Sequence, residues 1–260
     1  MRHPLEPIMA RLRKSSPGPY LLHLELLRER IPDPGRFPYT LPAIRHLQKL
    51  AFHPKVTFLV GENGSGKSTL LEAIAVAYGL NPEGGGRNFN FKTRASHSRL
   101  DEAIRLAKAP VRASTDYFLR AESFYNVATE IESLGLDLKP YGDKSLHEQS
   151  HGESFFALFK NRFMKNGFYL MDEPEAALSP KRQLEFLAIL HDHIHNGCQF
   201  VIATHSPIIM AYPNACIYLL DGIGIREIPY EETEHFLVTR GFLSNPKRAL
   251  SVLLAEQKDA

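Results

Sequence analysis

The stretch Gly61-Glu62-Asn63-Gly64-Ser65-Gly66-Lys67-Ser68-Thr69 decides the fold of this chain of 260 residues. An apolar run at 56–60 precedes it and predicts a buried strand, and the residues after it predict a helix over 68–78. The stretch matches the pattern G-x-x-x-x-G-K-[ST], in which glycines let backbone N–H groups and the helix N-terminus converge on phosphate oxygens. We therefore expect a phosphate-binding loop made by Gly61, Asn63, Gly64, Ser65, Gly66, Lys67, Ser68 and Thr69.

Within that loop, two side chains are expected to contact the ligand's charges. Lys67 would neutralise the β and γ phosphates of a nucleotide, and the Ser68 hydroxyl would ligate Mg²⁺. A glycine-rich turn without a ligand is the alternative. The strand before the loop and the helix after it favour the phosphate site.

Further short apolar runs lie at 168–171, 200–203 and 217–220, and none of them alternates with polar residues. Such runs are typical of strands that are buried on both faces of a sheet. Helical stretches are predicted at 154–163 and 180–194, and residues 20–31 predict a first strand. The alternation predicts an α/β fold with a mainly parallel sheet.

Two adjacent carboxylates follow the predicted strand at 168–171. Asp172 and Glu173 come directly after it and before Pro174. Ligands of open α/β sheets bind at the carboxyl ends of the strands, and successive side chains there point in different directions. We therefore expect Asp172 to hold Mg²⁺ and Glu173 to polarise an attacking water as general base.

The composition excludes several classes of protein. Hydrophobic residues make up 43% of the chain, the net charge is +2 and there are two cysteines, so neither a strongly basic nucleic-acid binder nor a disulfide-stapled protein is indicated. No apolar run is long enough to span a membrane, and no secretory signal is visible, which favours a cytoplasmic location. Residues 1–19 are expected to be a poorly ordered lead-in, and 20–260 a single domain.

The net charge of the whole chain is near zero, but one segment, which we expect to be an insert at 81–116, is basic. Its basic residues all lie between 87 and 112, where only Asp101 and Glu102 are acidic; they are Arg87, Lys92, Arg94, Arg99, Arg105, Lys108 and Arg112. Such a segment indicates either a surface that contacts the phosphates of a nucleic acid or a solvated face.

The motifs together resemble the ATP-binding cassette (ABC) ATPases. The phosphate loop, Met171-Asp-Glu-Pro-Glu175, Ala177-Leu-Ser179 and Thr204-His205-Ser206-Pro207 occur in the family's order over about residues 20–225. More closely they resemble its soluble branch of repair and chromosome-maintenance ATPases and stand-alone bacterial ATPases. The resemblance implies a P-loop fold with an antiparallel β subdomain and a small helical lobe (122–165), and two ATP molecules bound between two head-to-tail protomers.

The resemblance also assigns roles to residues beyond the loop. Gln149-Ser150-His151-Gly152-Glu153 is similar to the family's signature segment, so Ser150, Gly152 and Glu153 would contact nucleotide held by the other protomer. Ser150 and Glu153 also fit a capping box that opens a helix from Ser154. His205 matches the histidine that contacts the γ-phosphate and the attacking water. Glu122 stands where the family has a glutamine that senses Mg²⁺.

Spacing narrows the class of ABC ATPase but leaves the partner open. The segment from Lys67 to Asp172 is too short for long coiled-coil arms, and the distance from Glu122 to Ser150 leaves room only for a small helical lobe, which disfavours a transporter subunit and a membrane partner. One hypothesis is an ATP-dependent homodimer that acts with nucleic acid or a nucleic-acid enzyme, in repair or phage defence. The other is a nucleotide-binding energy-coupling or regulatory subunit for a protein partner, membrane-bound or soluble, including an ABC transporter. Phe37, Tyr39 and Phe52 are equal candidates for stacking on adenine.

Overall fold

A computed structural model describes residues 18–86, 98–121 and 151–255 of the chain. The strands are β1 (Leu21–Leu26), β2 (Lys49–Ala51), β3 (Val56–Val60), β4 (Ile104–Lys108), β5 (Thr115–Arg120), β6 (Gly167–Asp172), β7 (Gln199–Ala203), β8 (Cys216–Leu220) and β9 (Ile225–Glu227). The α-helices are α2 (Pro42–Arg45), α3 (Lys67–Tyr78), α4 (Leu100–Ala103), α6 (His151–Asn161), α7 (Pro180–His195), α8 (Glu234–Ser244) and α9 (Pro246–Ala255). Short 3₁₀ turns are η1 (Arg28–Arg30), η4 (Pro174–Ala177), η5 (Ile209–Ala211) and η6 (Tyr230–Glu232).

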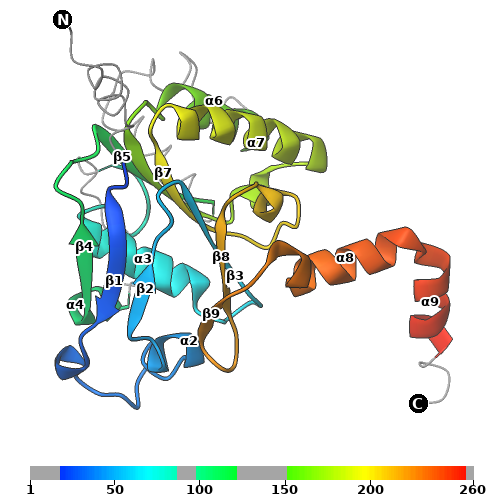
Figure 1. The fold of residues 1–260 in the computed structure, drawn as a ribbon. Coiled ribbons are helices and arrows are strands. Elements are labelled where there is room, and N and C mark those ends of the chain that lie inside the picture. The colour runs from blue at the N-terminus through cyan, green and yellow to red at the C-terminus, as the bar shows by residue number, and fades with distance from the viewer. Residues whose placement is uncertain (1–17, 87–97, 122–150, 256–260) are drawn as a thin grey trace, which may run out of the picture.

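The larger sheet has the strand order β5-β6-β7-β3-β8-β9. Every neighbouring pair in it is parallel except β8 and β9, which are antiparallel. Helices α6 and α7 cover one face of this sheet, and α3 lies on the other (Figure 1). The carboxyl ends of β3, β6 and β7 therefore point to the same edge.

Burial on both faces explains why the central strands lack polar alternation. In β6, Tyr169 and Met171 belong to the core shared with α6 and α7, whereas Phe168 and Leu170 belong to the core around α3. Strands β3, β6 and β7 are buried at every position. Strand β8 is only partly buried because β9 ends the sheet beside it.

A second sheet, of order β2-β1-β4, is antiparallel and packs over the α3 side of the larger one. One buried side chain joins the two sheets. Gln199 of β7 accepts hydrogen bonds from the backbone N–H groups of Tyr20 (2.8 Å) and Leu21 (2.9 Å) and donates to the carbonyls of Leu21 (2.8 Å) and His53 (3.0 Å).

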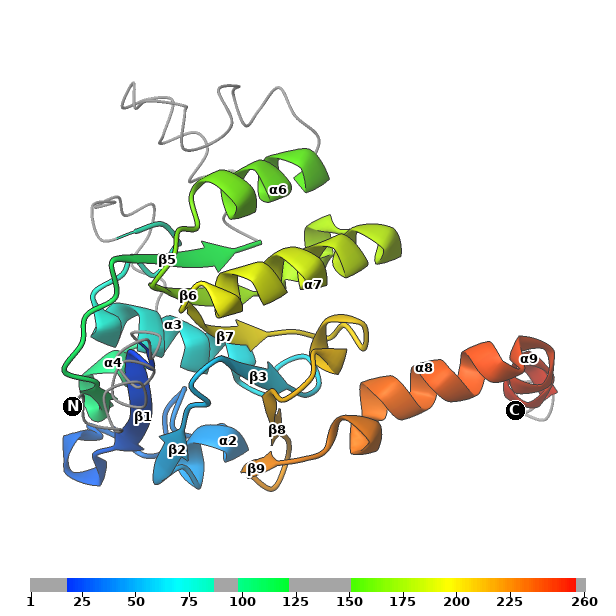
Figure 2. The ribbon, with the colours of Figure 1, turned by 45° about the horizontal axis from the view of Figure 1, so that its top comes forward.

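Helices α8 and α9 form an arm that projects from the body of the molecule (Figures 1 and 2). Neither helix contains a buried residue, and the exposed apolar side chains of the arm are Leu237, Val238, Phe242, Leu243, Leu250, Val252, Leu253 and Leu254. Among the helices within the described ranges, none is long and apolar enough to cross a membrane.

The predicted fold class is confirmed, because the structure has a mainly parallel central sheet, an antiparallel sheet and covering helices. The bounds of two predicted elements were wrong. The first strand ends at Leu26 and gives way to η1, and α6 spans His151–Asn161, whereas a helix over 154–163 was predicted. The lead-in 1–17 and most of the predicted helical lobe, 122–150, lie outside the described residues.

The basic segment at 81–116 is not a separate unit where the structure describes it. Residues 104–108 form β4, which pairs with β1, and Thr115 and Asp116 already belong to β5. The segment therefore contributes strands to both sheets, while residues 87–97 lie outside the described part of the chain.

Candidate active site

The phosphate loop joins the end of β3 to the start of α3. Gly61 has φ +143° and Gly66 has φ +100°, conformations that side chains other than glycine rarely adopt. A Cβ on Gly61 would lie 2.2 Å from the carbonyl oxygen of Leu220, so the loop passes directly against the end of β8. The glycines are thus required both for the curl of the loop and for its packing on the sheet.

Lys67 is the first residue of α3, and its side chain folds back into the loop. Its Nζ donates to the carbonyl oxygens of Gly61 (2.8 Å) and Glu62 (3.0 Å). Burial lowers the pKa of Lys67, and the carboxylates of Glu173 and Asp172 oppose that effect. The amine is therefore held inside the curl of the loop, where phosphate oxygens would lie.

Ser68 and Asp172 meet although they lie far apart in sequence. The Ser68 hydroxyl donates to Oδ1 of Asp172 at 3.0 Å. Burial raises the pKa of Asp172 to about 6, opposed chiefly by the Arg120 cation and by the hydrogen bond from Ser68. A hydroxyl and a carboxylate side by side are hard oxygen ligands of the kind that Mg²⁺ takes.

Glu173 adopts a left-handed conformation, with φ +50° and ψ +54°. Its backbone N–H donates to the carbonyl of Ala203 at 2.9 Å, which continues the pairing of β6 with β7. The sharp turn directs its carboxylate towards His205, whose Nε2 lies 3.5 Å from Oε1 of Glu173. A non-glycine residue in this region is strained, and such strain often marks a functional position.

His205 follows β7 and is held from two sides. Its backbone N–H donates to Oε1 of Glu175, and its ring Nδ1 lies 3.1 Å from Nε2 of His235 at the start of α8. Its Nε2 is buried and has no hydrogen-bond partner among the described residues. Burial lowers the pKa of His205, as does the nearby Lys67 cation.

The sequence did not single out Arg120 or His235. Arg120 ends β5 directly opposite Asp172 in the parallel register, where its Nε lies 3.6 Å from Oδ2 of Asp172 and its Nη1 donates to Oε2 of Glu72 at 3.0 Å. A charged residue that ends an apolar strand was the available signal for Arg120. His235 lies in a polar, acidic stretch and carried no such signal.

The described signature candidates belong to another element, α6. Gly152 and Glu153 are in the first turn of α6, next to η4, where a Cβ on Gly152 would lie 3.2 Å from the Ala177 carbonyl oxygen. Ser150 and Glu122 lie outside the described residues. Of the three aromatic candidates for adenine, only Phe37 is exposed, whereas Tyr39 and Phe52 are part of the core.

The residues present fit a nucleotide with Mg²⁺. Besides the Ser68 and Asp172 pair, the Ser65 hydroxyl in the loop is buried without a hydrogen-bond partner among the described residues, as is Nε2 of His205. Two orphaned polar groups beside a buried lysine are a donor set suited to phosphate oxygens.

Comparisons with known proteins agree with this geometry. A family model described as "AAA domain" matches residues 39–133, and one described as "AAA domain, putative AbiEii toxin, Type IV TA system" matches residues 88–211. The cytochrome c biogenesis ATP-binding export protein CcmA of Mesorhizobium japonicum is 31% identical over 163 residues, which cover 58% of this chain and 78% of that protein.

Two solved structures share the fold. An ATP-binding cassette of an ABC transporter, in its ADP conformation, has a TM-score of 0.52 with 18% identity and covers 88% of this chain and 97% of its own. CbiO1 from Clostridium perfringens, part of an ABC transporter complex, has a TM-score of 0.50 with 15% identity and covers 90% of this chain and 99% of its own.

The fold and the loop define a P-loop nucleotide-binding protein. Within that class, the match to CcmA over most of that protein shows that the chain belongs to the ABC-type ATPase family.

Proposed function

We propose that this protein binds ATP and hydrolyses it with Mg²⁺. The observation that carries the proposal is the convergence of three strand ends on one edge of the sheet. Ser68 contacts Asp172 at 3.0 Å, and His205 faces Glu173 at 3.5 Å. Lys67 would neutralise phosphate charge, Ser68 and Asp172 would hold Mg²⁺, Glu173 would polarise the attacking water, and His205 would donate to the γ-phosphate.

We further propose that each site is completed by a second copy of the chain. Gly152 and Glu153 lie on α6 next to η4, and α6 covers the face of the larger sheet opposite α3, the helix that the phosphate loop enters (Figure 1). This placement supports a role on nucleotide bound by another protomer, as the family's head-to-tail arrangement implies. The helix N-terminus at His151 would present its positive end to that phosphate.

The test is the variant Glu173→Gln, which keeps the side chain's size and removes the base. We expect it to bind ATP normally, to accumulate as an ATP-bound dimer by light scattering, and to lose at least ~10²-fold in turnover. Lys67→Ala should lose ATP binding instead. Glu185→Gln, which alters a half-buried carboxylate paired with Arg182 on α7, is the matched control. Wild-type turnover by Glu173→Gln would refute the role of the base.

The partner proposed first is nucleic acid, contacted by the basic segment at 87–112. Two of its basic residues already form ion pairs within the protein, since Arg105 pairs with Glu25 and Arg99 pairs with Glu102. The test therefore uses charge reversal at Lys92 and Arg94, with Arg105→Gln as the control. We expect DNA or RNA binding by the ATP-bound dimer to weaken steeply with salt and to fall with the first pair of changes only. Binding that is absent, or independent of salt, would refute this partner.

A protein partner, including a membrane transporter, is the second candidate. The names of curated relatives favour it, since CcmA is described as an ATP-binding export protein. Copurification with a transmembrane protein, together with ATPase stimulation by that protein and not by nucleic acid, would select this candidate and place the chain outside the soluble branch.

A further inference from the structure

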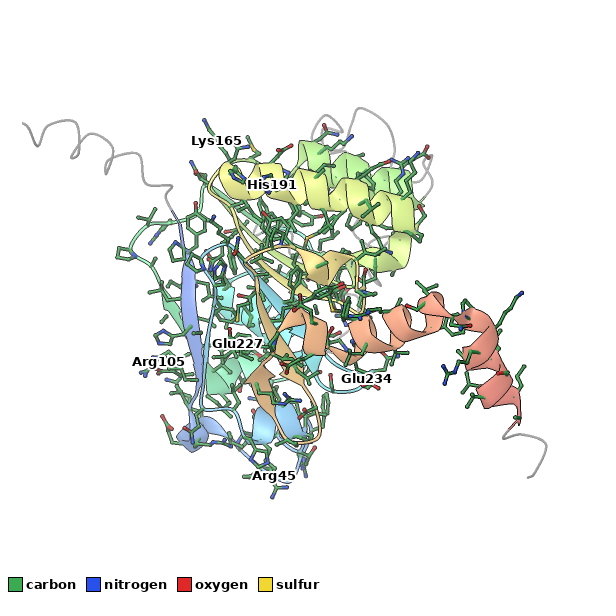
Figure 3. The ribbon with its side chains drawn as sticks, turned by 45° about the vertical axis from the view of Figure 1, so that its right-hand side comes forward. Arg45, Arg105, Lys165, His191, Glu227 and Glu234 are labelled. Carbon is green, nitrogen blue, oxygen red and sulfur yellow. The ribbon has the colours of Figure 1, made fainter. Side chains whose placement is uncertain are left out.

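The contact between His205 and His235 joins the candidate catalytic edge to the start of the C-terminal arm. His235 is the second residue of α8, next to Glu234, which Figure 3 labels. Its Nε2 lies 3.1 Å from Nδ1 of His205, within hydrogen-bond distance. The two side chains come from segments 30 residues apart, so the contact depends on the placement of α8.

Three hydrogen bonds fix that placement. The Tyr230 hydroxyl donates to the carbonyl oxygen of Pro207 at 2.8 Å, two residues after His205. The Thr233 hydroxyl donates to the Tyr230 carbonyl at 2.7 Å and caps α8 by accepting from the N–H of Phe236. Thr233 is fully buried. The start of α8 is therefore tied to the same loop that carries His205.

The contact between the two rings has only two hydrogen-bonding arrangements when both are neutral, because one nitrogen must donate and the other must accept. Burial lowers the pKa of both histidines, which keeps them neutral near pH 7. If Nδ1 of His205 donated, its Nε2 would carry a lone pair facing Oε1 of Glu173 at 3.5 Å. If His235 donates, Nε2 of His205 carries the proton instead.

The second arrangement is favoured by electrostatics. When His235 donates, the N–H of His205 Nε2, and not a lone pair, faces the carboxylate of Glu173. The buried Nε2, which has no hydrogen-bond partner among the described residues, is then a donor that a ligand can use. The tautomer of a histidine is commonly set in this way by the bond that its other nitrogen makes.

We propose that His235 is a positioning residue: it donates from Nε2 to Nδ1 of His205 and thereby holds His205 in the Nε2–H tautomer that presents a donor to the nucleotide's terminal phosphate. The tautomer follows from the contact between the two rings and the charge that faces them, whereas its effect on catalysis rests on the proposed ATPase function.

The experiment compares His235→Gln, whose amide can still donate to Nδ1 of His205, with His235→Leu, which cannot. Long-range ¹H–¹⁵N spectra of histidine-labelled protein report the tautomer of His205, whose signal is assigned by its loss in His205→Gln. Steady-state ATPase assays report kcat and KM. His191→Leu is the control, since it removes another histidine that contacts a neighbouring side chain, here the Tyr212 hydroxyl at 3.0 Å.

We expect the Nε2–H tautomer in the wild-type protein and in His235→Gln, and a shift towards Nδ1–H in His235→Leu. The kcat should fall about 10-fold or more in His235→Leu, with KM changed by less than about 2-fold, and His235→Gln should restore most of the loss. His191→Leu should behave as wild type.

The opposite results overturn the proposal. An Nδ1–H tautomer in the wild-type protein, or an unchanged tautomer in His235→Leu, refutes the positioning role even if the protein proves not to hydrolyse ATP. A normal kcat in His235→Leu, or an equal loss in the glutamine and leucine variants, refutes the link to catalysis. Absence of turnover in the wild-type protein would instead refute the proposed function, which keeps the two failures distinct.

Discussion

Replacing Gly61 with alanine tests whether the phosphate loop is held in shape by its contact with β8. The added Cβ would lie 2.2 Å from the Leu220 carbonyl oxygen and 3.1 Å from the Ser65 hydroxyl. Relief of that overlap requires the loop and the end of β8 to separate by roughly 1 Å, because non-bonded carbon and oxygen atoms do not approach so closely. The φ of +143° adds strain of about 1–3 kcal/mol for any residue with a side chain.

Gly64 offers a matched control in the same loop. Its φ is +78°, but a Cβ there would meet nothing within 4 Å. Gly64→Ala should therefore cost only the backbone strain of the left-handed conformation, about 1–2 kcal/mol. Gly61→Ala bears a comparable strain and a backbone clash as well, so we expect it to lose at least ~2 kcal/mol more in the free energy of unfolding.

The assay is urea unfolding followed by circular dichroism without nucleotide, so that an effect on ATP binding does not enter. The slope of the transition should stay constant between the variants, and the midpoint should shift further for Gly61→Ala. ATP titration of the folded proteins then reports whether the distorted loop has lost affinity. Equal stabilities of the two alanine variants, within about 0.5 kcal/mol, would refute the reasoning, since that is the usual spread for substitutions that disturb no packing.

Three further predictions concern the sheet and the site. Gln199→Leu should lower the free energy of unfolding by about 2–4 kcal/mol in urea titrations, because it leaves buried backbone groups of Tyr20 and Leu21 without partners; a loss below about 1 kcal/mol would contradict this. Phe159→Ala should lose about 3–5 kcal/mol, because it removes a fully buried ring stacked on Phe186 at 4.8 Å; the same titration checks it. Burial raises the pKa of Asp172 from its ordinary value of 3.8 to about 6. In the absence of Mg²⁺ and nucleotide, the protonated carboxyl therefore contributes stability that is fully present below about pH 4 and is lost as the pH rises through 6. Asp172→Asn should remove this loss of stability between pH 4 and 6, which amounts to up to about 3 kcal/mol in the free energy of unfolding. If the free energy of unfolding changes with pH in the same way in both proteins, this prediction is wrong.

The sequence predicted a helix or strand correctly where the residues that determine it are neighbours in the chain. The loop glycines and the apolar run before them located β3 and α3 to within one residue, because a turn of this kind depends on residues that are contiguous. The run at 168–171 predicted β6 for a similar reason. Strands that are buried on both faces need apolar side chains at every position, so the absence of alternation was itself the signal.

Three of the strands that the sequence did not reveal, β2, β4 and β9, are short and at least half exposed. Strand β4 carries Arg105 and Lys108, so its composition indicated a charged surface segment. It becomes a strand through pairing with β1, in which Arg105 lies opposite Glu25 and forms an ion pair with it. That partner is 80 residues away, and no local pattern reports it.

The contacts of Arg120 and His235 were hidden for the same reason. Each depends on register between distant segments, namely β5 against β6 and α8 against the loop after β7. A sequence motif names the residues that a ligand needs, whereas the residues that orient them are chosen by the tertiary structure.

Strand register also explains why the candidate catalytic groups meet. Asp172 lies opposite Ala203 in the pairing of β6 with β7, and Leu59 lies opposite the same Ala203 in the pairing of β3 with β7. The pairing continues past the strands, since Glu173 donates to the Ala203 carbonyl and Thr204 donates to that of Leu59. A slip of one residue between β6 and β7 would turn Asp172 to the opposite face of the sheet and away from Ser68. The interior packing of β6 and β7 therefore determines the geometry of the site, and their core residues act on its chemistry without touching a ligand.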